Sequence, residues 1–484
     1  MRDPAMNAPL RRSRPYIFWG QTQSLCETCL TLVPAKIQIL GEEVWYEKRC
    51  KHHGVQSTLV STDAAYWRRC KEFIKPGDKP LAFQRHTEFG CPFDCGLCPD
   101  HEQHSCLALI EITEHCNLTC PVCFADSSPA RSSFVPLATV EKMLDSLVAS
   151  EGEPDLVQIS GGEPTLHPDF FAILDAARAR PIRHVMINTN GLRIAREPDF
   201  VARLAQNKRG LEVYLQFDSL ERNALINLRG ADLLKIRQRA LENLEQQGIS
   251  TTLVVTVKRG VNDQEVGDIV RHALKWKCVR GVTLQPVQDA GRNENFNKDT
   301  DRIMLSEIRK RVVETGVFGD TDMIPLPCNP ESISIGYGLR NGETVLPLTS
   351  LIPQEQLLAV MPNTISPEKY PVLREKFIDL FSLSSGALNT SERVAELLCC
   401  LPTFEVPAGL SYENVFRVTI VQFLDRFNFC VGNVKRSCIH FVTSKGEIIP
   451  FDTYNLFYRN GSIDGIRAAM AREAIERNQA ELLR

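Results

Sequence analysis

The chain has 484 residues, of which 43% are hydrophobic and 24% are charged, and its formal net charge is −3. These values are typical of a globular protein with two or three domains, and the slight acidity argues against a nucleic-acid partner. No apolar run approaches the ~20 residues of a membrane-spanning helix, and the basic segment Met1–Arg14 lacks the apolar centre of a signal peptide. We therefore expect a cytoplasmic protein without a transmembrane span, which leaves peripheral membrane contact open.

The cysteine content points to metal binding. The chain has 17 cysteines, and seven of them lie between Cys91 and Cys123. In a reducing compartment, closely spaced cysteines are more often metal ligands than disulfide partners. Isolated buried thiols would account for a residue such as Cys278, but not for this concentration.

Residues 16–60 carry two short pairs of metal-ligand residues. Cys26 and Cys29 form a CXXC pair, and Cys50 and His53 form a CXXH pair further along the chain. The stretch between the pairs alternates apolar and polar residues as a β-hairpin does. Two ligand pairs on hairpins suit tetrahedral coordination of zinc or of a single iron, as in rubredoxin, with a structural role. The alternative is that His53 caps a turn and Cys50 is a free thiol.

Residues 61–106 are predicted to form a linker and a second metal-binding segment. The cysteines of this segment follow the spacing CX3CX2CX7C, at Cys91, Cys95, Cys98 and Cys106. Four thiolates can close a cubane iron–sulfur cluster completely. We interpret this set as the ligands of an auxiliary cluster.

From residue 107 to residue 300, the pattern of strand, loop and helix is repeated. The predicted strands are 107–113, 155–160, 184–191, 211–218, 250–257 and 279–287. Six βα units in succession predict an α/β fold in which a parallel sheet curves into a partial (βα)6 barrel of the TIM type. In such barrels, catalytic groups lie on the loops after the carboxyl ends of the strands. Residues 301–484 are expected to form a C-terminal α+β domain.

Two motifs fall on these loops. The loop after the first predicted strand carries Cys116, Cys120 and Cys123 with CX3CX2C spacing, and the loop after the second reads GGEP at 161–164. Three thiolates leave one iron of a cubane cluster without a protein ligand, so a small molecule can bind there. Each motif alone is weak evidence, but the pair, separated by one helix and one strand, is specific. This arrangement resembles the radical S-adenosylmethionine (SAM) superfamily.

The resemblance implies a 4Fe–4S cluster that is held by the three cysteines and binds SAM through its open iron. One electron from the cluster then cleaves SAM to methionine and a 5′-deoxyadenosyl radical, which abstracts hydrogen from a substrate. The residues that the resemblance assigns to SAM are Gly161, Gly162, Glu163 and Pro164 for the amino group and, by position alone, Asn188, Asn190, Gln216 and Asp218 for the ribose or carboxylate. The superfamily usually has an aromatic residue where this chain has Val122, so either Phe124 or the backbone is expected to meet the adenine.

The segment 90–126 and the upstream CXXC and CXXH pairs resemble one branch of this superfamily more closely. That branch contains archaeal tetraether lipid synthases and 7,8-dihydro-6-hydroxymethylpterin dimethyltransferases. The resemblance extends over residues 16–460 and implies a mononuclear iron or zinc site, an auxiliary 4Fe–4S cluster and the SAM-binding cluster. It leaves open a third 4Fe–4S cluster, whose candidate ligands are Cys328, Cys430 and Cys438. Branch members tend to have a further cysteine where this chain has Asp452, so buried thiols without a cluster are the competing interpretation.

Only the predicted strand 107–113 separates Cys106 from Cys116. Its seven residues, fully extended, span about 23 Å at ~3.3 Å per residue. The auxiliary cluster is therefore expected at the opposite end of this strand from the SAM-binding cluster. In that position it would act as an electron relay or a structural site rather than bind substrate.

These observations favour an enzyme and leave its substrate open. The first hypothesis is a radical SAM enzyme that forms or alters a C–C bond at an unactivated sp3 carbon, with a lipid chain as candidate substrate. The alternative is C-methylation of a pterin-like heterocycle, without cobalamin because the sequence has no DXHXXG segment. A non-catalytic iron–sulfur electron carrier is a remote third. An electron donor such as flavodoxin or ferredoxin is expected in both enzymatic cases, and the oligomeric state is left open.

Overall fold

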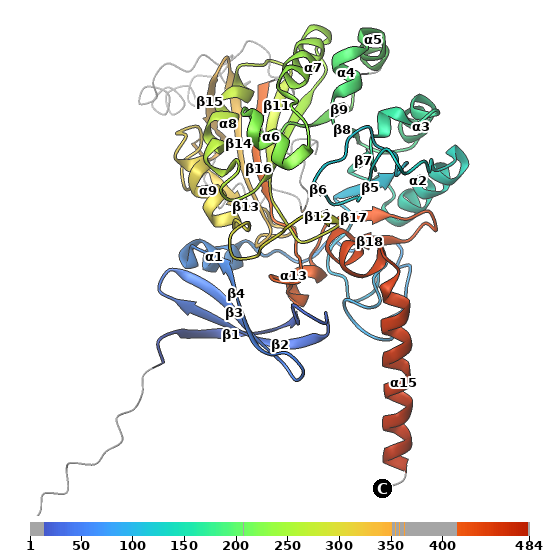
Figure 1. Cartoon of the computed structure of the whole chain (residues 1–484), viewed down its shortest axis with the longest axis vertical. Coiled ribbons are helices and arrows are strands. Elements are labelled where there is room, and N and C mark those ends of the chain that lie inside the picture. Colours follow the sequence, from blue (N-terminus) through green and yellow to red (C-terminus); the bar gives the residue numbers. More distant parts are fainter. Residues whose placement is uncertain are drawn as a thin grey trace, which may run out of the picture.

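The computed structural model describes residues 14–206, 208–350, 354, 358, 363 and 414–482 (Figure 1). These residues form a 4-stranded sheet at the N-terminus, a 12-stranded sheet, and a two-stranded ribbon of β6 (Val122–Cys123) and β12 (Arg292–Asn293). No helix in this part of the chain is long and apolar enough to cross a membrane.

The N-terminal module is an antiparallel sheet with its strands in sequence order. The strands are β1 (Ile17–Leu25), β2 (Leu32–Leu40), β3 (Glu43–Cys50) and β4 (Gly54–Ser61). The turn between β2 and β3 begins at Gly41, whose φ of 61° is a conformation that glycine adopts without strain. The structure therefore contains the hairpin that the alternating pattern predicts within residues 16–60. Helix α1 (Ala64–Cys70) and the 3-10 turn Lys71–Phe73 follow the module.

A fully buried lysine docks the N-terminal module on the rest of the chain. The Lys48 side chain is 0% exposed, and its Nζ donates hydrogen bonds to the carbonyl oxygens of Arg426 at 3.0 Å and Phe427 at 2.7 Å. Glu27 lies 3.5 Å from this Nζ and also pairs with Lys298 at 2.6 Å. Burial lowers the pKa of Lys48 to about 8, although the charge of Glu27 acts in the opposite direction. The contact joins three distant parts of the chain around one buried charge.

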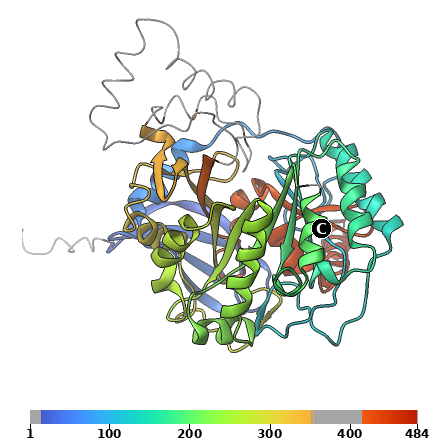
Figure 2. The same ribbon diagram turned by 90° about the horizontal axis from the view of Figure 1, so that it is seen from above.

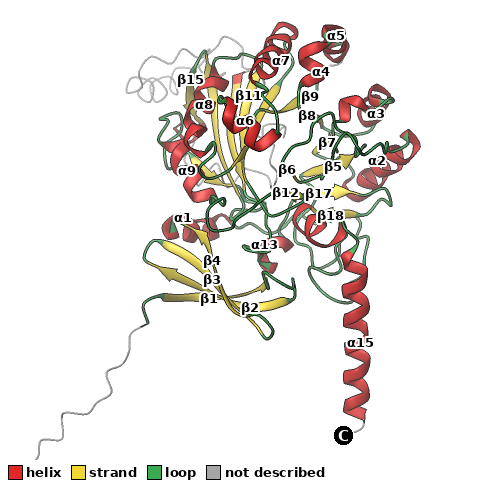
Figure 3. Ribbon diagram, in the orientation of Figure 1, coloured by secondary structure: helices red, strands yellow, loops and turns green. Residues whose placement is uncertain are grey.

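Six parallel strands form the centre of the large sheet, and helices cover its outer side (Figures 2 and 3). The strands are β5 (Leu107–Glu111), β7 (Leu156–Ser160), β8 (His184–Thr189), β9 (Leu211–Gln216), β10 (Thr251–Val257) and β11 (Val279–Pro286), each parallel to the next. The helices between them are α2 (Leu137–Glu151), α3 (Phe170–Arg178), α4 (Leu192–Arg196), α5 (Pro198–Ala205), α6 (Arg222–Arg229), α7 (Leu234–Gln247) and α8 (Val266–Leu274). The predicted partial (βα)6 barrel is confirmed.

The chain after residue 300 adds strands to both ends of this parallel sheet. Beyond β11 lie β16 (Val415–Val421), β14 (Ile333–Asn341), β13 (Met323–Pro325) and β15 (Thr344–Pro347), and beyond β5 lie β17 (Ile439–Val442) and β18 (Ile448–Pro450). β16 is parallel to β11 and β17 is parallel to β5, whereas the outermost strands are antiparallel. The helical segments are α9 (Leu305–Val313), α13 (Val431–Lys435), α14 (Phe451–Thr453), a π-helical turn Tyr454–Tyr458, and α15 (Ser462–Leu482).

The strands expected to form a separate C-terminal domain over 301–484 therefore belong to the barrel sheet. β16 and β17 are close in sequence, yet they lie at opposite ends of the parallel core. The sequence pattern does not show this, because an extended apolar segment can pair with any strand edge whose hydrogen-bonding groups are free. The helices that the sequence predicts at 368–386 and 391–401 lie outside the described residues.

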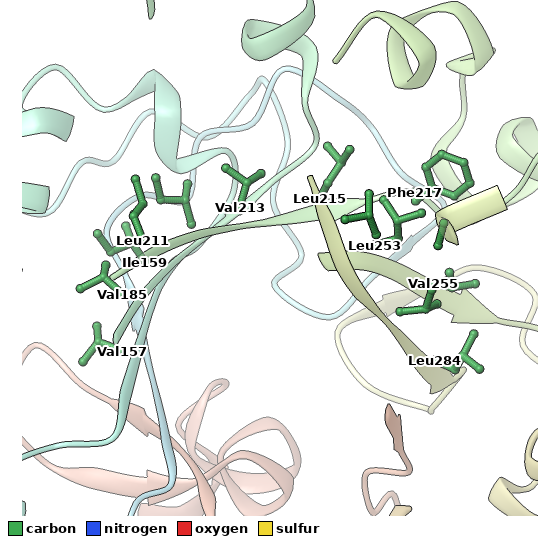
Figure 4. Close-up of a cluster of buried hydrophobic side chains, with 14 of the residues drawn as sticks. Val157, Ile159, Val185, Leu211, Val213, Leu215, Phe217, Leu253, Val255 and Leu284 are labelled. Atoms are coloured by element: carbon green, nitrogen blue, oxygen red, sulfur yellow. The ribbon is translucent and has the colours of Figure 1, made fainter. Parts of the chain in front are cut away.

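Side chains of the parallel strands alternate between two faces of the sheet. Val157, Val185 and Val213 come from three neighbouring strands and pack with helix side chains in the main apolar core (Figure 4). Gln158, which follows Val157, and Tyr214, which follows Val213, line the inside of the barrel instead. Because strand side chains alternate with a period of two, each short strand supplies both the outer core and a partly polar interior.

Replacing Lys48 by methionine should lower the free energy of unfolding by about 3 kcal/mol, because it leaves the carbonyl groups of the half-buried Arg426 and Phe427 without their donor and removes a cation from Glu27. Chemical denaturation measures this change. Lys36→Met is the matched control on the same sheet, since Lys36 is 53% exposed and pairs with Glu47 at the surface. The control should change the free energy by less than about 1 kcal/mol. Equal effects of the two substitutions would show that the buried contact does not hold the module in place.

Candidate active site and metal centres

The two motifs meet at the carboxyl ends of β5 and β7. The backbone N–H of Gly162 donates to the carbonyl oxygen of Thr113 at 2.7 Å, and that of Glu163 donates to the carbonyl oxygen of His115 at 2.8 Å. This approach requires glycine: a Cβ at Gly161 would lie 2.3 Å from the Thr113 oxygen, and one at Gly162 would lie 2.1 Å from the His115 oxygen. The GGEP loop therefore lies directly against the loop that carries the three cysteines.

Glu163 ties these loops to a third loop, which follows β8. Its carboxylate accepts hydrogen bonds from the hydroxyl groups of Thr165 at 2.6 Å and Thr189 at 2.8 Å, and from the backbone N–H of Asn190 at 2.8 Å. Burial raises the pKa of Glu163, and these hydrogen bonds act in the opposite direction. Because protein groups occupy both of its oxygens, the glutamate positions the loops rather than lining the space between them.

The loops enclose a cavity of about 950 Å³, a volume that includes the part open to solvent. The predicted site residues on its wall are Cys116, Cys120, Cys123, Phe124, Gly161, Gly162, Asn188, Asn190 and Gln216. Glu163, Pro164 and Asp218, which the sequence also suggested, do not line it. Val122 lies on the wall with Phe124, so the position that is usually aromatic in the superfamily is part of the cavity here as well.

Arg229, at the end of α6, belongs to this site but is part of no motif. Its guanidinium forms a two-point ion pair with Asp218, at 2.7 and 2.6 Å, and donates to Gln216 Oε1 at 2.9 Å. It lies on the cavity wall beside Cys120, where burial raises the pKa of the thiol and the charge of Arg229 opposes the increase. Asp218 therefore holds the guanidinium of Arg229 in position and does not itself line the cavity. An arginine on a helix is normally a surface residue, so nothing in the sequence marks this one.

The residues on this wall suit a cubane cluster with a small zwitterionic ligand. The three thiols come from one loop, and burial raises the pKa of Cys116 to about 12, so a metal is needed to hold that residue as a thiolate. On the same wall, the backbone of 161–162, the amides and Arg229 provide donors and acceptors for amino, carboxylate and ribose groups.

The N-terminal module holds its predicted ligands within reach of one ion. The ligand atoms of Cys26, Cys29, Cys50 and His53 all lie within 4.8 Å of one another, and the Sγ atoms of Cys29 and Cys50 are 3.9 Å apart. Tetrahedral coordination with ~2.3 Å bonds to sulfur requires a separation of about 3.8 Å. The backbone N–H of His52 donates to Cys50 Sγ and lowers the pKa of that thiol to about 6. The geometry favours zinc or a single iron over a turn-capping His53 beside a free Cys50.

The four cysteines expected to hold one auxiliary cluster lie in two places. Cys91, Cys95 and Cys98 line a cavity of about 300 Å³, a volume that includes the part open to solvent. Cys106 lies elsewhere, with its Sγ within 4.8 Å of the Sγ atoms of Cys328 and Cys438. The structure therefore corrects the grouping that the spacing CX3CX2CX7C suggested. Cys106 precedes β5 and Cys116 follows it, so these two cysteines do lie at opposite ends of the strand.

The candidate third cluster keeps two of its predicted ligands. The Sγ atoms of Cys328 and Cys438 are 3.4 Å apart, and Cys106 takes the place that the sequence suggested for Cys430. Cys430 lies against the N-terminal module, with its Sγ 3.2 Å from Thr22 Oγ1, in a different apolar cluster. Three thiols at these distances can bind one metal ion or three corners of a cluster.

The three-cysteine site lies where the two ends of the large sheet meet. Cys328 follows β13, at one end of the strand order, whereas Cys106 and Cys438 precede β5 and β17, toward the other end. Within the described residues, the sheet is open between β13 and β18. A metal or cluster bound by the three cysteines would therefore join the two ends of an open barrel.

Buried histidines connect the two auxiliary cysteine sites. His101 lies on the wall of the 300 Å³ cavity, and its Nε2 is 3.1 Å from Nε2 of His440, two residues after Cys438. His440 Nδ1 is in turn 2.9 Å from Ser105 Oγ. Burial lowers the pKa of both imidazoles, that of His101 to about 4, so both rings are neutral near pH 7. The two sites are linked through a short run of buried polar contacts.

Comparison with known proteins identifies the class that this fold and site define. The family model described as the radical SAM superfamily matches residues 110–273, which hold the cysteine loop and the GGEP loop. The model described as the HMPTM N-terminal zinc ribbon domain matches residues 18–62, the module with the four-ligand site. The class is thus that of radical SAM enzymes with an N-terminal zinc ribbon.

A relative matches nearly the whole chain. The 7,8-dihydro-6-hydroxymethylpterin dimethyltransferase of Methanocaldococcus jannaschii is 30% identical over 479 residues, which cover 91% of this chain and 94% of the relative. The chain therefore belongs to the radical SAM superfamily, in the branch of this dimethyltransferase. It is an enzyme that uses a 4Fe–4S cluster and SAM, and its other cysteine sites fit an auxiliary cluster and a mononuclear zinc or iron.

Two further similarities each cover less than half of the chain. A GTP 3′,8-cyclase of Synechocystis is 25% identical over 205 residues, which cover 42% of this chain and 61% of the relative. The structure of Streptococcus suis SuiB bound to its precursor peptide SuiA is 19% identical, with a TM-score of 0.35, and the match covers 41% of this chain and 43% of SuiB. That structural similarity is too low to bear on function.

Replacing Cys328 by serine should lower both the iron content and the melting temperature of anaerobically prepared protein, because the substitution removes one of three ligands that join the ends of the sheet. Iron analysis and thermal unfolding measure the two effects. The matched control is Cys278→Ser, since Cys278 is 2% exposed and lies in none of the described cysteine sites. The same iron content in both variants and the wild type would show that the three-cysteine site binds no iron.

Replacing Glu163 by glutamine should weaken SAM binding about tenfold and leave the iron content unchanged, because the amide cannot accept all three hydrogen bonds that position the loops. Equilibrium binding of SAM to reconstituted protein measures this. Glu265→Gln is the control: Glu265 also accepts hydrogen bonds, from Ser219, but does not line the cavity beside the three cysteines. Undiminished SAM affinity in folded Glu163→Gln would refute the positioning role.

Proposed function

We propose that the chain is a radical SAM C-methyltransferase that acts on a pterin-like heterocycle. The observation that carries this proposal is the similarity to the M. jannaschii dimethyltransferase over 91% of the chain. Similarity of this extent supports the reaction class more strongly than the substrate, because substrate choice depends on a few site residues. Lipid C–C bond formation, which the sequence placed first, has no comparable support among the relatives described above.

In this proposal Cys116, Cys120 and Cys123 hold the 4Fe–4S cluster, and SAM occupies the cavity beside them. When bound, the cluster and SAM supply the radical chemistry that removes hydrogen from carbon. The chain positions SAM with the backbone of 161–162 and the amides of the wall, and keeps the positive charge of Arg229 beside the cysteines.

A second cavity inside the barrel is the proposed substrate chamber. Its volume is about 750 Å³, which includes the part open to solvent, and its wall combines apolar residues with polar ones from the inner face of the strands. The residues that line both this chamber and the SAM cavity are Phe124, Asn188, Gln216, Gln285, Phe423 and Phe451. A substrate in the chamber would therefore face SAM directly.

The inner face next to this chamber supports a compact substrate. Arg417, on the chamber wall, pairs at 2.5 Å with the fully buried Glu212, which also lies 3.2 Å from His184 and accepts a hydrogen bond from Thr252. These side chains fill the amino-terminal part of the barrel. A long apolar tunnel would suit a lipid chain, whereas a short chamber with a few polar groups suits a heterocycle.

The reaction needs electrons from outside the chain, for which we propose a flavodoxin or a ferredoxin. Passage through the auxiliary sites is consistent with the buried histidine link between them. A non-catalytic electron carrier would need no enclosed cavities beside its cluster, so the two cavities favour the enzyme.

Anaerobic reconstitution with iron, sulfide, SAM and dithionite tests the proposal. Wild type should form 5′-deoxyadenosine, Cys120→Ala should form none, and Cys278→Ser should retain the activity. With methyl-deuterated SAM and 7,8-dihydro-6-hydroxymethylpterin, wild type should give a pterin with a deuterated methyl group on carbon. If wild type forms 5′-deoxyadenosine but no labelled pterin, the proposed substrate is refuted and the assignment to radical SAM enzymes stands. No 5′-deoxyadenosine from reconstituted wild type would refute the reaction.

A further inference from the structure

Gln158 lies in the middle of β7, with its side chain on the inner face of the barrel. Its backbone is paired with Leu109 of β5 and Met186 of β8, and it lines the proposed substrate chamber. Only 4% of the residue is exposed. It is as buried as many core residues, yet it carries a primary amide.

Within the described residues, no protein group hydrogen-bonds to the Gln158 side chain, and its amide is not among the polar groups that are sealed off without a partner, so it reaches the free space of the chamber. Other amides on the chamber wall are engaged: Asn188 donates to Ser160 Oγ at 3.0 Å, and Gln216 donates to Asn188 Oδ1 at 2.7 Å. A buried amide without a partner destabilises a fold, so such groups mark places where a ligand or water completes the hydrogen bonds. At Gln158, the space available for that partner is the chamber.

The chemistry of the wall narrows the class of this partner. A primary amide offers a carbonyl acceptor next to two N–H donors, which complement a lactam edge, where N–H and C=O are adjacent. The charge of Arg417 is already paired with Glu212, so the chamber does not require an ionised ligand. At the junction with the SAM cavity, Phe423 and Phe451 stack with their ring centroids 3.9 Å apart, and such aromatic surfaces suit a flat ring.

We propose that Gln158 is a specificity-determining residue that binds the lactam edge of a neutral, flat heterocycle in the chamber. This inference rests on the proposed function, because it names the group by which the heterocycle is held. With its lactam edge at Gln158, the ring extends toward the junction between the two cavities. Its opposite edge then faces SAM.

Gln158→Met tests this assignment with a side chain of similar size that lacks the amide. The probe is 7,8-dihydro-6-hydroxymethylpterin, and the sample is full-length, cluster-reconstituted protein with S-adenosylhomocysteine in the SAM cavity. The Kd for the probe should rise about 30-fold, the effect of losing two hydrogen bonds of ordinary strength. The melting temperature should not fall, because the substitution removes no hydrogen bond to another protein group.

A second measurement separates recognition from a structural effect. Wild type should discriminate against an analogue that is methylated on the lactam nitrogen, and Gln158→Met should bind both compounds equally. Gln38→Met is the matched control, because Gln38 is a buried glutamine of the N-terminal module, 9% exposed, that lines neither cavity. It should leave affinity and discrimination unchanged. Gln158→Leu replaces the methionine variant if that variant fails to fold.

Three outcomes would overturn the assignment. Equal affinity of wild type and Gln158→Met for the probe, with methylation intact, refutes the role of Gln158 and leaves the proposed function standing. Weaker binding with unchanged discrimination against the methylated analogue shows a structural effect instead. Wild type that forms 5′-deoxyadenosine but does not bind the pterin refutes both the substrate and the assignment that rests on it.

Discussion

The alternation of side chains along the parallel strands is the constraint on which both the core and the site depend. In each central strand, residues such as Val157 and Val213 pack outward against helices, and the next residues, Gln158 and Tyr214, face the interior. A shift of one residue in any strand would exchange the two sets. Curving the sheet then converts its inner face into two adjoining cavities, one beside the three motif cysteines and one deeper in the barrel.

Polar groups inside the barrel are stable because almost all of those described above pair with one another. Glu212 lies between Arg417 and His184, and Arg229 connects Asp218 to Gln216 at the cavity wall. Such pairing offsets the loss of hydration that burial imposes. Against this background the unpaired amide of Gln158 is an exception, and unpaired groups of this kind are expected where a protein sacrifices stability for binding.

Site residues that are close together in the sequence were predicted correctly, whereas contacts between residues far apart in the sequence were not. The four ligands of the N-terminal module and the two motif loops were predicted, because each set lies on successive hairpins of one small sheet or on neighbouring loops. The assignments of Cys106 and Cys430 needed correction, because the relevant neighbours are set by how the sheet ends meet. Arg229 was missed, since its role depends on where α6 places it and not on any spacing.

By itself, then, the sequence determined the class of chemistry: the order of βα units, three cysteines after the first strand and GGEP after the second. These features are local, and backbone sterics and strand periodicity translate them directly into structure. Only the tertiary structure decided which cysteines share a metal, that the C-terminal strands complete the barrel, and that a buried amide faces the chamber. Those outcomes follow from long-range strand pairing. The pattern of residues within a strand is compatible with many partner strands, and burial of the whole sheet selects one of these pairings.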